Sequence, residues 1–167
     1  MNMRNTVFTL AATTVGLLFM VTGASGHGDE SKGSQRKAES GVIEKPFGKS
    51  ADARKATRTI KVDMSDKMRF TPEALSIKRG ETVRFLVTNS GKTMHEMVLG
   101  TMQELKEHAG LMRKFPEMEH DAPYMAHVKP GHTEALAWQF TKTGEFFYGC
   151  LVPGHLEAGM LGRIVVR

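Results

Sequence analysis

The chain has a single cysteine, Cys150, and it lies in a short C-terminal run that also contains a histidine and a methionine. His155 follows Cys150 after four residues, and Met160 follows His155 after another four. Pro153-Gly154 and Ala158-Gly159 are turn signals, and strand-like stretches flank the run on both sides. The pattern predicts a loop, anchored at both ends, that folds a thiol, an imidazole and a thioether toward one point.

A second imidazole lies far upstream. His95 comes shortly after the strand-like run 82–89. A thiolate and two imidazoles with a weak axial thioether form the ligand set of a blue-copper site. Two alternatives compete with copper: Cys150 is a buried structural thiol and Met160 a core residue, or the site binds zinc, which takes Cys and His readily. Methionine is a poor zinc ligand, so Met160 favours copper.

At these residues the chain resembles the cupredoxins, the small blue-copper proteins that include plastocyanin and azurin. The resemblance covers roughly residues 58–167 and rests on His95 in Thr93-Met94-His95-Glu96-Met97 and on the Cys-x4-His-x4-Met loop. It implies an all-β fold, a Greek-key β-sandwich. It also implies a type 1 copper site whose ligands are His95, Cys150, His155 and Met160.

Two positions depart from the family pattern. Many cupredoxins carry Asn directly after the upstream histidine, where it ties the ligand loops together, and here that position is Glu96. Many carry Ser or Thr after the cysteine, and here that position is Leu151. Because hydrogen bonds around the ligands tune a metal site, the potential and the colour of this site are open.

Alternating apolar and polar residues predict a sandwich of short strands separated by Gly, Pro and Asn turns. Between residues 100 and 132 the pattern changes. Thr101 and Glu104 form a capping-box signature for a helix that ends near Phe115, before Pro116. Residues 117–132 show little regular pattern, so we expect a helix-containing insertion in the sandwich. The predicted strands are 59–64, 68–70, 74–77, 82–89, 96–99, 134–140, 145–150 and 163–166.

Methionine and histidine are concentrated in this insertion. Met118 and His120 are two residues apart, as are Met125 and His127, and residues two apart in extended chain point the same way. Thioethers prefer Cu(I), so each pair is a candidate for additional copper. The alternative is that the methionines fill gaps in the core and the histidines are solvated.

The N-terminus has the three parts of a secretory signal peptide. Arg4 precedes the uncharged apolar stretch 6–21, and small residues follow at 23–26. The apolar stretch is shorter than the roughly 20 residues that span a bilayer. We therefore predict a cleaved signal at 1–26, no membrane span in the mature protein and, with the resemblance, a periplasmic location; an uncleaved anchor is the alternative.

Cleavage near Gly26 would place His27 at or near the new N-terminus, where its imidazole and the terminal amine could chelate copper. Residues 27–57 are polar and predict a flexible segment, although the stretch 42–47 could instead dock on the domain edge. The cupredoxin domain is expected at 58–167. The net charge of +5 is modest and indicates a partner with an acidic face rather than nucleic acid.

Three functions are compatible with these features. The first is a copper-binding protein of copper tolerance, similar to cupredoxins of the CopI type, which buffers copper and oxidises Cu(I) to Cu(II). The second is a single-copper carrier that passes electrons between transient redox partners. The third, a multicopper enzyme, is disfavoured because such enzymes use His-x-His pairs and more domains, and this sequence has no such pair.

Overall fold

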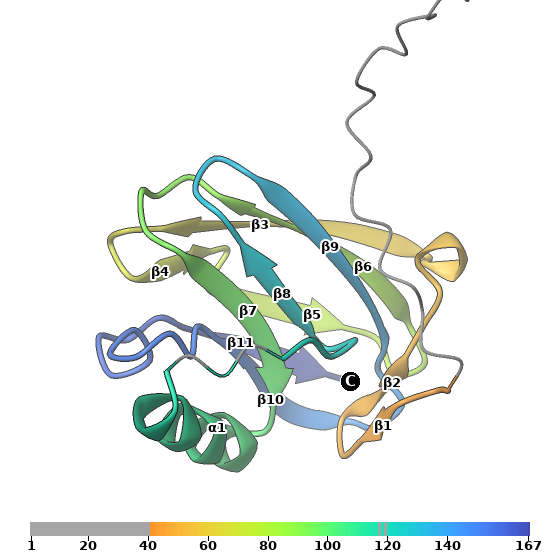
Figure 1. Cartoon of the computed structure of the whole chain (residues 1–167). Coiled ribbons are helices and arrows are strands. Elements are labelled where there is room, and N and C mark those ends of the chain that lie inside the picture. Colours follow the sequence, from red (N-terminus) through yellow and green to blue (C-terminus); the bar gives the residue numbers. More distant parts are fainter. Residues whose placement is uncertain (1–40, 117, 119) are drawn as a thin grey trace, which may run out of the picture. The chain divides into compact units, whose positions relative to one another are not determined.

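The computed structural model describes residues 41–116, 118 and 120–167, so the predicted signal peptide and His27 lie outside the described residues. Figure 1 shows two β-sheets packed face to face with a helix at one side. One sheet has the strand order β1-β2-β9-β6-β3-β4, and the other has the order β5-β11-β10-β7-β8. In chain order the elements are β1 (Glu44–Lys45), β2 (Gly48–Ser50), a 3₁₀ turn (Ala53–Lys55), β3 (Arg58–Ser65), β4 (Arg69–Thr71), β5 (Ala74–Ile77), β6 (Thr82–Asn89), β7 (His95–Gly100), α1 (Met102–Lys114), β8 (Met125–Val128), β9 (Thr133–Gln139), β10 (Gly144–Gly149) and β11 (Leu161–Val166).

The predicted all-β sandwich is confirmed, and the alternation in the strands explains it. Ile60, Val62 and Met64 alternate along β3 and are all buried between the sheets. β3 pairs in parallel with β6, and β5 pairs in parallel with β11 in the other sheet. The chain therefore crosses from one sheet to the other between β4 and β5. The apolar faces of the two sheets form one core, as expected for a sandwich.

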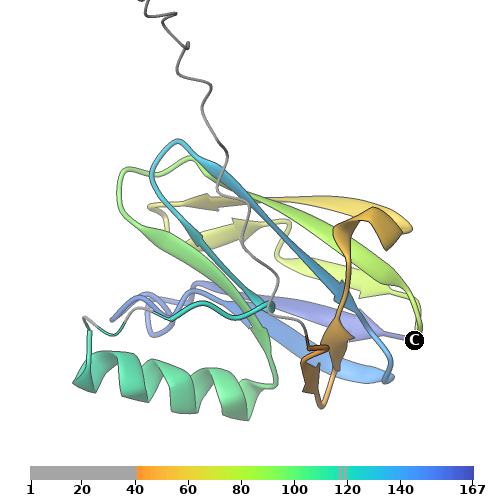
Figure 2. The same ribbon diagram turned by 45° about the vertical axis from the view of Figure 1, so that its right-hand side comes forward.

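The predicted helix is also confirmed, with the predicted cap. The Thr101 side chain accepts from the Glu104 backbone N–H, and the Glu104 carboxylate accepts from the Thr101 N–H at 2.9 Å. Leu105 and Ala109 are the buried residues of α1. They pack with Val98, Met125 and Leu151 in a second apolar cluster, so α1 covers the outer face of the second sheet (Figure 2).

Strand β8 corrects the expectation of an irregular segment at 117–132. Ala126 and Val128 enter the main core, whereas Met125 is buried under the helix. β8 pairs antiparallel with β7, with His95 opposite Val128 and Glu96 opposite His127. Pro123 and Pro130 flank the strand closely and hide its four-residue pattern in the sequence.

The N-terminal part of the domain begins earlier than predicted. The expected flexible segment reached residue 57, but β1 and β2 lie within it and β2 pairs with β9. Phe47 is fully buried, and its ring centroid lies 5.0 Å from that of Trp138. Lys45 bonds Glu104 of α1 at 3.3 Å. Strand pairing, the burial of Phe47 and the Lys45–Glu104 ion pair together hold this stretch, which corresponds to the alternative that 42–47 docks on the domain edge. In the part of the chain that the structure describes, no helix is long and apolar enough to cross a membrane.

Candidate metal centre

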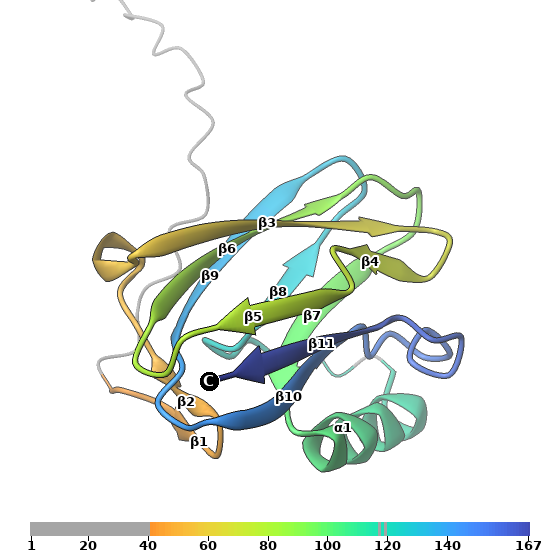
Figure 3. The same ribbon diagram turned by 180° about the vertical axis from the view of Figure 1, so that it is seen from behind.

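The C-terminal run forms the predicted loop between β10 and β11 at one end of the sandwich (Figure 3). Cys150 directly follows β10, and its N–H donates to the Met160 carbonyl at 3.1 Å. The Met160 N–H donates to the His155 carbonyl at 3.0 Å. The loop is therefore closed at its base by its own backbone, and the three side chains are held without help from a ligand.

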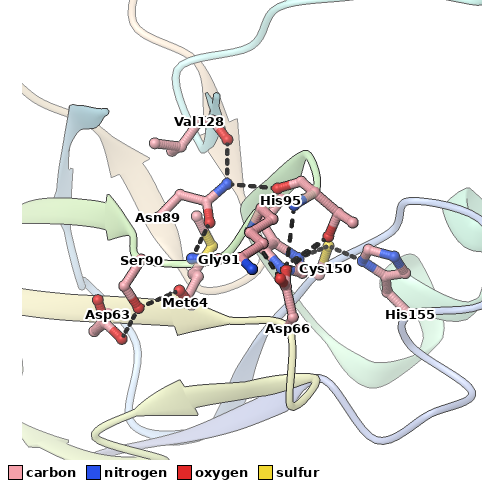
Figure 4. A network of polar contacts seen from close by, with 12 residues as sticks. Asp63, Met64, Asp66, Asn89, Ser90, Gly91, His95, Val128, Cys150 and His155 are labelled. Atoms are coloured by element: carbon pink, nitrogen blue, oxygen red, sulfur yellow. Dashed lines mark hydrogen bonds and ion pairs between the residues drawn. The ribbon is translucent and has the colours of Figure 1, made fainter. Parts of the chain in front are cut away.

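Three of the four predicted ligands converge. Donor atoms of His95, Cys150 and His155 all lie within 4.8 Å of one another. The Cys150 Sγ is 3.2 Å from Nδ1 of His155 and 3.9 Å from Nδ1 of His95 (Figure 4). The two imidazole centroids are 5.0 Å apart. Met160 is fully buried in the main core, and its backbone bonds to Cys150 and His155 hold it at the base of the same loop.

Asp66, which the sequence analysis missed, orients His95. Its Oδ1 lies 3.1 Å from Nε2 of His95, so that nitrogen carries the proton and Nδ1 presents its lone pair to the sulfur. Backbone N–H groups of Lys92 and Thr93 hold the carboxylate and, with the hydroxyl of Thr93, keep the pKa of Asp66 well below its usual range. A Cβ at Gly91 would lie 2.3 Å from Asp66 Oδ1, so glycine allows this close approach.

The loop before His95 is fixed by a buried amide. Asn89, at the end of β6, is fully buried and donates from Nδ2 to the carbonyls of Thr93 and Val128, both at 2.8 Å (Figure 4). Its Oδ1 accepts from the Gly91 N–H at 2.9 Å. All three bonds are buried or half-buried, where such a network specifies one backbone conformation. The position of His95 therefore follows from β6 as well as from β7.

Glu96 takes the place of the expected asparagine and joins the two ligand loops. It is almost fully buried, and its Oε1 accepts from the Leu151 N–H at 2.9 Å. Its own N–H points at the Cys150 Sγ at 3.4 Å. The other carboxylate oxygen lies 2.9 Å from Nδ1 of His127. The carboxylate thus ties the His95 strand to the Cys150 loop, and it also connects the cysteine to a partly exposed imidazole.

Burial controls the charge of the ligands. It raises the pKa of the Cys150 thiol to about 12, although N–H groups of Glu96 and Val152 oppose the shift. Burial, followed by the neighbouring His95, lowers the pKa of His155. Without a metal the site therefore holds a thiol and a neutral imidazole at His155. A bound cation would displace the thiol proton, because metal ions deprotonate coordinating thiols.

The donor set fits copper. The Cys150 sulfur and a ring nitrogen from each of His95 and His155 form a triangle of donor atoms, and the buried thioether of Met160 lies in the same loop as Cys150. Soft thiolate and thioether donors with imidazole select copper over hard cations. The group is built on residues fixed by hydrogen bonds from two strands, and such supporting contacts raise both the affinity and the selectivity of a metal site.

The Met/His segment is arranged differently from the sequence expectation. Met125 is fully buried in the cluster under α1, so it packs as a core residue. Met118 is exposed and His120 is half-buried, and both line a surface depression of about 820 Å³ with Met112 and His127. The ring of His120 lies 4.7 Å from that of His108, a helix residue that the sequence analysis did not name as a candidate ligand. Helical spacing alone gives no sign of this contact.

Both ring nitrogens of His127 face oxygen atoms that can only accept. Nδ1 meets Glu96, and Nε2 lies 3.0 Å from the His120 carbonyl oxygen. A ring protonated on both nitrogens would satisfy both oxygen atoms. The hydrogen bond to Glu96 accordingly raises the pKa of His127. Both ring nitrogens of His127 are therefore engaged with oxygen atoms, and the Met125 thioether, predicted to bind copper with it, packs under α1.

The comparisons with known proteins agree with this geometry. Residues 56–167 match the family of copper binding proteins described as plastocyanin/azurin. The "Copper-resistant cuproprotein CopI" of Rubrivivax gelatinosus is 44% identical over 165 residues, covering 99% of this chain and all of the relative. The protein of the same name from Pseudomonas aeruginosa is 35% identical, covering 72% of this chain and 82% of the relative.

Solved structures share the fold at low sequence identity. The "blue" copper protein auracyanin A of Chloroflexus aurantiacus has a TM-score of 0.56 at 21% identity, covering 65% of this chain and 98% of auracyanin A. The sandwich fold, the convergent Cys and His donors and the CopI relatives all indicate a copper-binding cupredoxin. The chain therefore belongs to the plastocyanin/azurin family of copper-binding proteins, and copper is its cofactor.

Proposed function

We propose that this protein is a periplasmic type 1 copper protein that acts in copper tolerance. In this proposal His95, Cys150 and His155 would hold copper through the atoms that converge in the structure, and the thioether of Met160 would be the fourth and weakest ligand. The observation that carries the proposal is the approach of the Cys150 Sγ to the Nδ1 atoms of both imidazoles. The buried position of Met160 supports its role as the fourth ligand.

Copper bound to this set supplies a one-electron couple between Cu(I) and Cu(II). The chain contributes rigidity. Asp66 holds one imidazole, Glu96 holds the loop at Leu151, and the loop base is closed by backbone bonds. Ligands fixed in this way keep similar positions in both oxidation states, so little rearrangement opposes the gain or loss of an electron.

The proposed role in tolerance is supported by the names of the two relatives and by their coverage of this chain. The predicted signal peptide supports export. The proposed reaction is the oxidation of cuprous cargo. A Cu(I) ion would give one electron to the oxidised type 1 site and become the less toxic Cu(II). A redox partner protein would then accept that electron and restore the site.

A single-copper electron carrier is the second candidate. His155 is half-buried at the surface, beside Val152 and the exposed Pro153. Leu151 is buried and packs under α1, so it adds no exposed apolar surface beside His155. The apolar surface that remains suits a small and transient encounter. This function needs one copper and no tolerance phenotype.

Copper titration of the mature protein tests the proposal, with metal content and visible spectrum read from the same samples. We expect the first Cu(II) equivalent to give an intense thiolate-to-copper band. Copper uptake with no such band would contradict the type 1 assignment. Deletion of the gene should lower the copper concentration that cells tolerate, and an unchanged tolerance curve would favour the simple carrier.

A further inference from the structure

The β3–β4 hairpin lies at the same end of the sandwich as the 150–160 loop, which carries three of the proposed ligands (Figure 3). The two strands of the hairpin are joined by a turn at 66–68. Side chains on either side of this turn contact both ligand-bearing segments. Asp66 bonds the ring of His95, whereas Arg69 bonds the backbone of the 150–160 loop.

The guanidinium group of Arg69 bridges the hairpin and the loop through one nitrogen atom. Nη1 donates to the Met68 carbonyl oxygen at 2.7 Å and to the Ala158 carbonyl oxygen at 3.0 Å. This nitrogen carries two hydrogen atoms, so each carbonyl can receive one of them. Nε of the same group lies 3.7 Å from a carboxylate oxygen of Glu73, which adds a weak, exposed ion pair. Arg69 therefore ties together two backbone segments that are distant in the sequence.

The loop accommodates this guanidinium group at a glycine. A Cβ added at Gly159 would lie 3.1 Å from Nη1 of Arg69 and 3.7 Å from Nη2. Gly159 also has a φ of +90°, a left-handed conformation that favours glycine. Another residue at this position would both strain the turn and press against the guanidinium group. The turn directly before Met160 is therefore shaped to receive Arg69.

The contact from Arg69 differs from the other contacts to this part of the loop. The bond from the Met160 N–H to the His155 carbonyl lies within the loop itself. Arg113 of α1 reaches the loop from outside, but it bonds the side chain of Glu157, and both of these side chains are exposed. Such a pair restrains the backbone only weakly. Arg69 instead bonds the backbone directly, at a point between the two proposed ligands His155 and Met160.

The residue before Arg69 has an uncommon backbone conformation. Met68 has a φ of 57° and is the only residue other than glycine with a positive φ among the described residues. Its N–H donates to the Ser65 carbonyl at 2.9 Å, which closes the turn of the hairpin. A left-handed conformation costs such a residue free energy and persists where the surrounding contacts require it. The Met68 side chain packs against the main core, and its carbonyl accepts from Arg69, so these contacts hold the hairpin in the form that directs Arg69 to the loop.

We propose that Arg69 is a positioning residue of the copper centre, which holds the turn before Met160 and thereby positions the Met160 thioether. This inference rests on the proposed function, because it takes Met160 as the fourth ligand. The β3–β4 hairpin then serves both ligand-bearing segments, since Asp66 holds His95 and Arg69 holds the 150–160 loop. A weak thioether ligand tunes the properties of a copper–thiolate site, so a half-exposed arginine outside the ligand set would influence them.

Hydrogen exchange of the full mature protein without metal tests whether Arg69 holds the loop. Arg69→Ala removes the bond to the loop, and we expect the amide hydrogens of Gly159 and Met160 to exchange about fivefold faster than in the wild type. Arg58→Ala is the matched control, because Nη1 of Arg58 also donates to a backbone carbonyl at 3.0 Å, that of Ser76, at the other end of β3. The two arginine side chains are about equally exposed. The control should leave both rates unchanged, and equal rates in all three proteins would overturn the inference.

Spectra of the same proteins loaded with one equivalent of Cu(II) test the positioning role. The electron paramagnetic resonance spectrum and the ratio of the visible bands report how the ligands are arranged, whereas a reduction potential would also respond to the lost positive charge. We expect Arg69→Ala to change both spectra and Arg58→Ala to leave them as in the wild type. Arg69→Lys, whose ammonium group can donate to the same two carbonyls, should return the spectra toward those of the wild type.

The two measurements separate this inference from the proposed function. Unchanged spectra in Arg69→Ala would overturn the positioning role even if exchange is faster, because the loop would then loosen without effect on the ligands. A wild type with no visible band would contradict the proposed function. The exchange rates, which need no copper, would then still decide whether Arg69 holds the loop.

Discussion

Two pairs of histidine rings in this protein have similar spacing but different surroundings. The His95–His155 pair includes a fully buried ring and is adjacent to a thiol; Asp66, in the turn after β3, holds the His95 ring, and Asn89, at the end of β6, holds the loop before it. The His108–His120 pair joins a helix to an irregular segment and has thioethers nearby. The first pair is therefore held in one arrangement by the fold, whereas the arrangement of the second pair depends on the contact between the helix and the segment that follows it.

Glu96 and His127 lie between the two pairs. Glu96 is buried beside Cys150, and His127 is partly exposed beside His120. Their ion pair at 2.9 Å is the shared element of both regions. Variants on either side of this pair should therefore affect one region only, and variants of the pair itself should affect both.

The largest expected effect is that of Cys150→Ser. A serine hydroxyl does not replace the thiolate, so the visible thiolate-to-copper band should be lost completely. The His108–His120 contact should be unchanged, so the ring signals of these two histidines should stay in place in long-range ¹H–¹⁵N spectra of the metal-free variant. A shift of these signals as large as that of His155 would contradict the comparison.

Removal of the shared carboxylate should destabilise the fold. Glu96→Ala leaves the buried Leu151 N–H without its acceptor and the His127 imidazolium without its partner. We expect the free energy of unfolding of the metal-free protein to fall by about 3 kcal/mol in urea denaturation. Glu107→Ala, at an exposed acid of α1, is the control and should change it by less than about 0.5 kcal/mol. Equal values for the two variants would argue against a linking role of Glu96.

Asp66→Ala should weaken the main centre alone. Without the carboxylate, the tautomer and ring orientation of His95 are no longer fixed, and loss of such a partner typically lowers metal affinity about 10- to 100-fold. Asp63→Ala is the control, because Asp63 accepts from Ser90 and contacts no proposed ligand in the described residues. Copper affinity measured by competition at the visible band should fall in the first variant only. An equal fall in the two variants would contradict the positioning role of Asp66.

The smallest effect concerns pH. The pKa of His127 is raised above its ordinary value of 6.5 by the bond to Glu96. Its ion pair therefore stabilises the fold fully below pH 6.5, and this contribution declines as pH rises through the folded-state pKa. The free energy of unfolding of the metal-free proteins, measured in urea, should be higher for the wild type than for His127→Gln at about pH 6. This difference should shrink by about 1 kcal/mol or less between about pH 6 and about pH 8.5. A difference that grows with pH would contradict the imidazolium assignment.

Much of the fold could be predicted because local patterns and tertiary packing agree. The strand 82–89 was predicted with the bounds of β6, and the cap at Thr101 was predicted from two residues. β8 and the N-terminal strands were missed, since each is short and is held by partners distant in sequence. Phe47 shows the reason: its burial against Trp138 could not be inferred from the polar residues around it.

The ligand loop at 150–160 could be predicted from the sequence, whereas the contacts that residues make across the fold could not. The spacing of Cys150, His155 and Met160 is local, so the sequence indicates their convergence. Asp66 and His108 act across the fold, and no spacing in the sequence relates them to His95 or His120. The role of Glu96 was predicted only in part. Its departure from the family pattern drew attention to the position, but only the structure shows that its carboxylate joins the two ligand loops.

The central claim is that one copper ion is bound by the sulfur of Cys150 and two imidazoles. X-ray absorption at the copper edge of the full mature protein, loaded with one equivalent of Cu(II), tests it most directly. We predict one short copper–sulfur distance and two nitrogen scatterers of imidazole type, in a sample that also shows the visible band. A copper environment of nitrogen and oxygen alone would contradict this account.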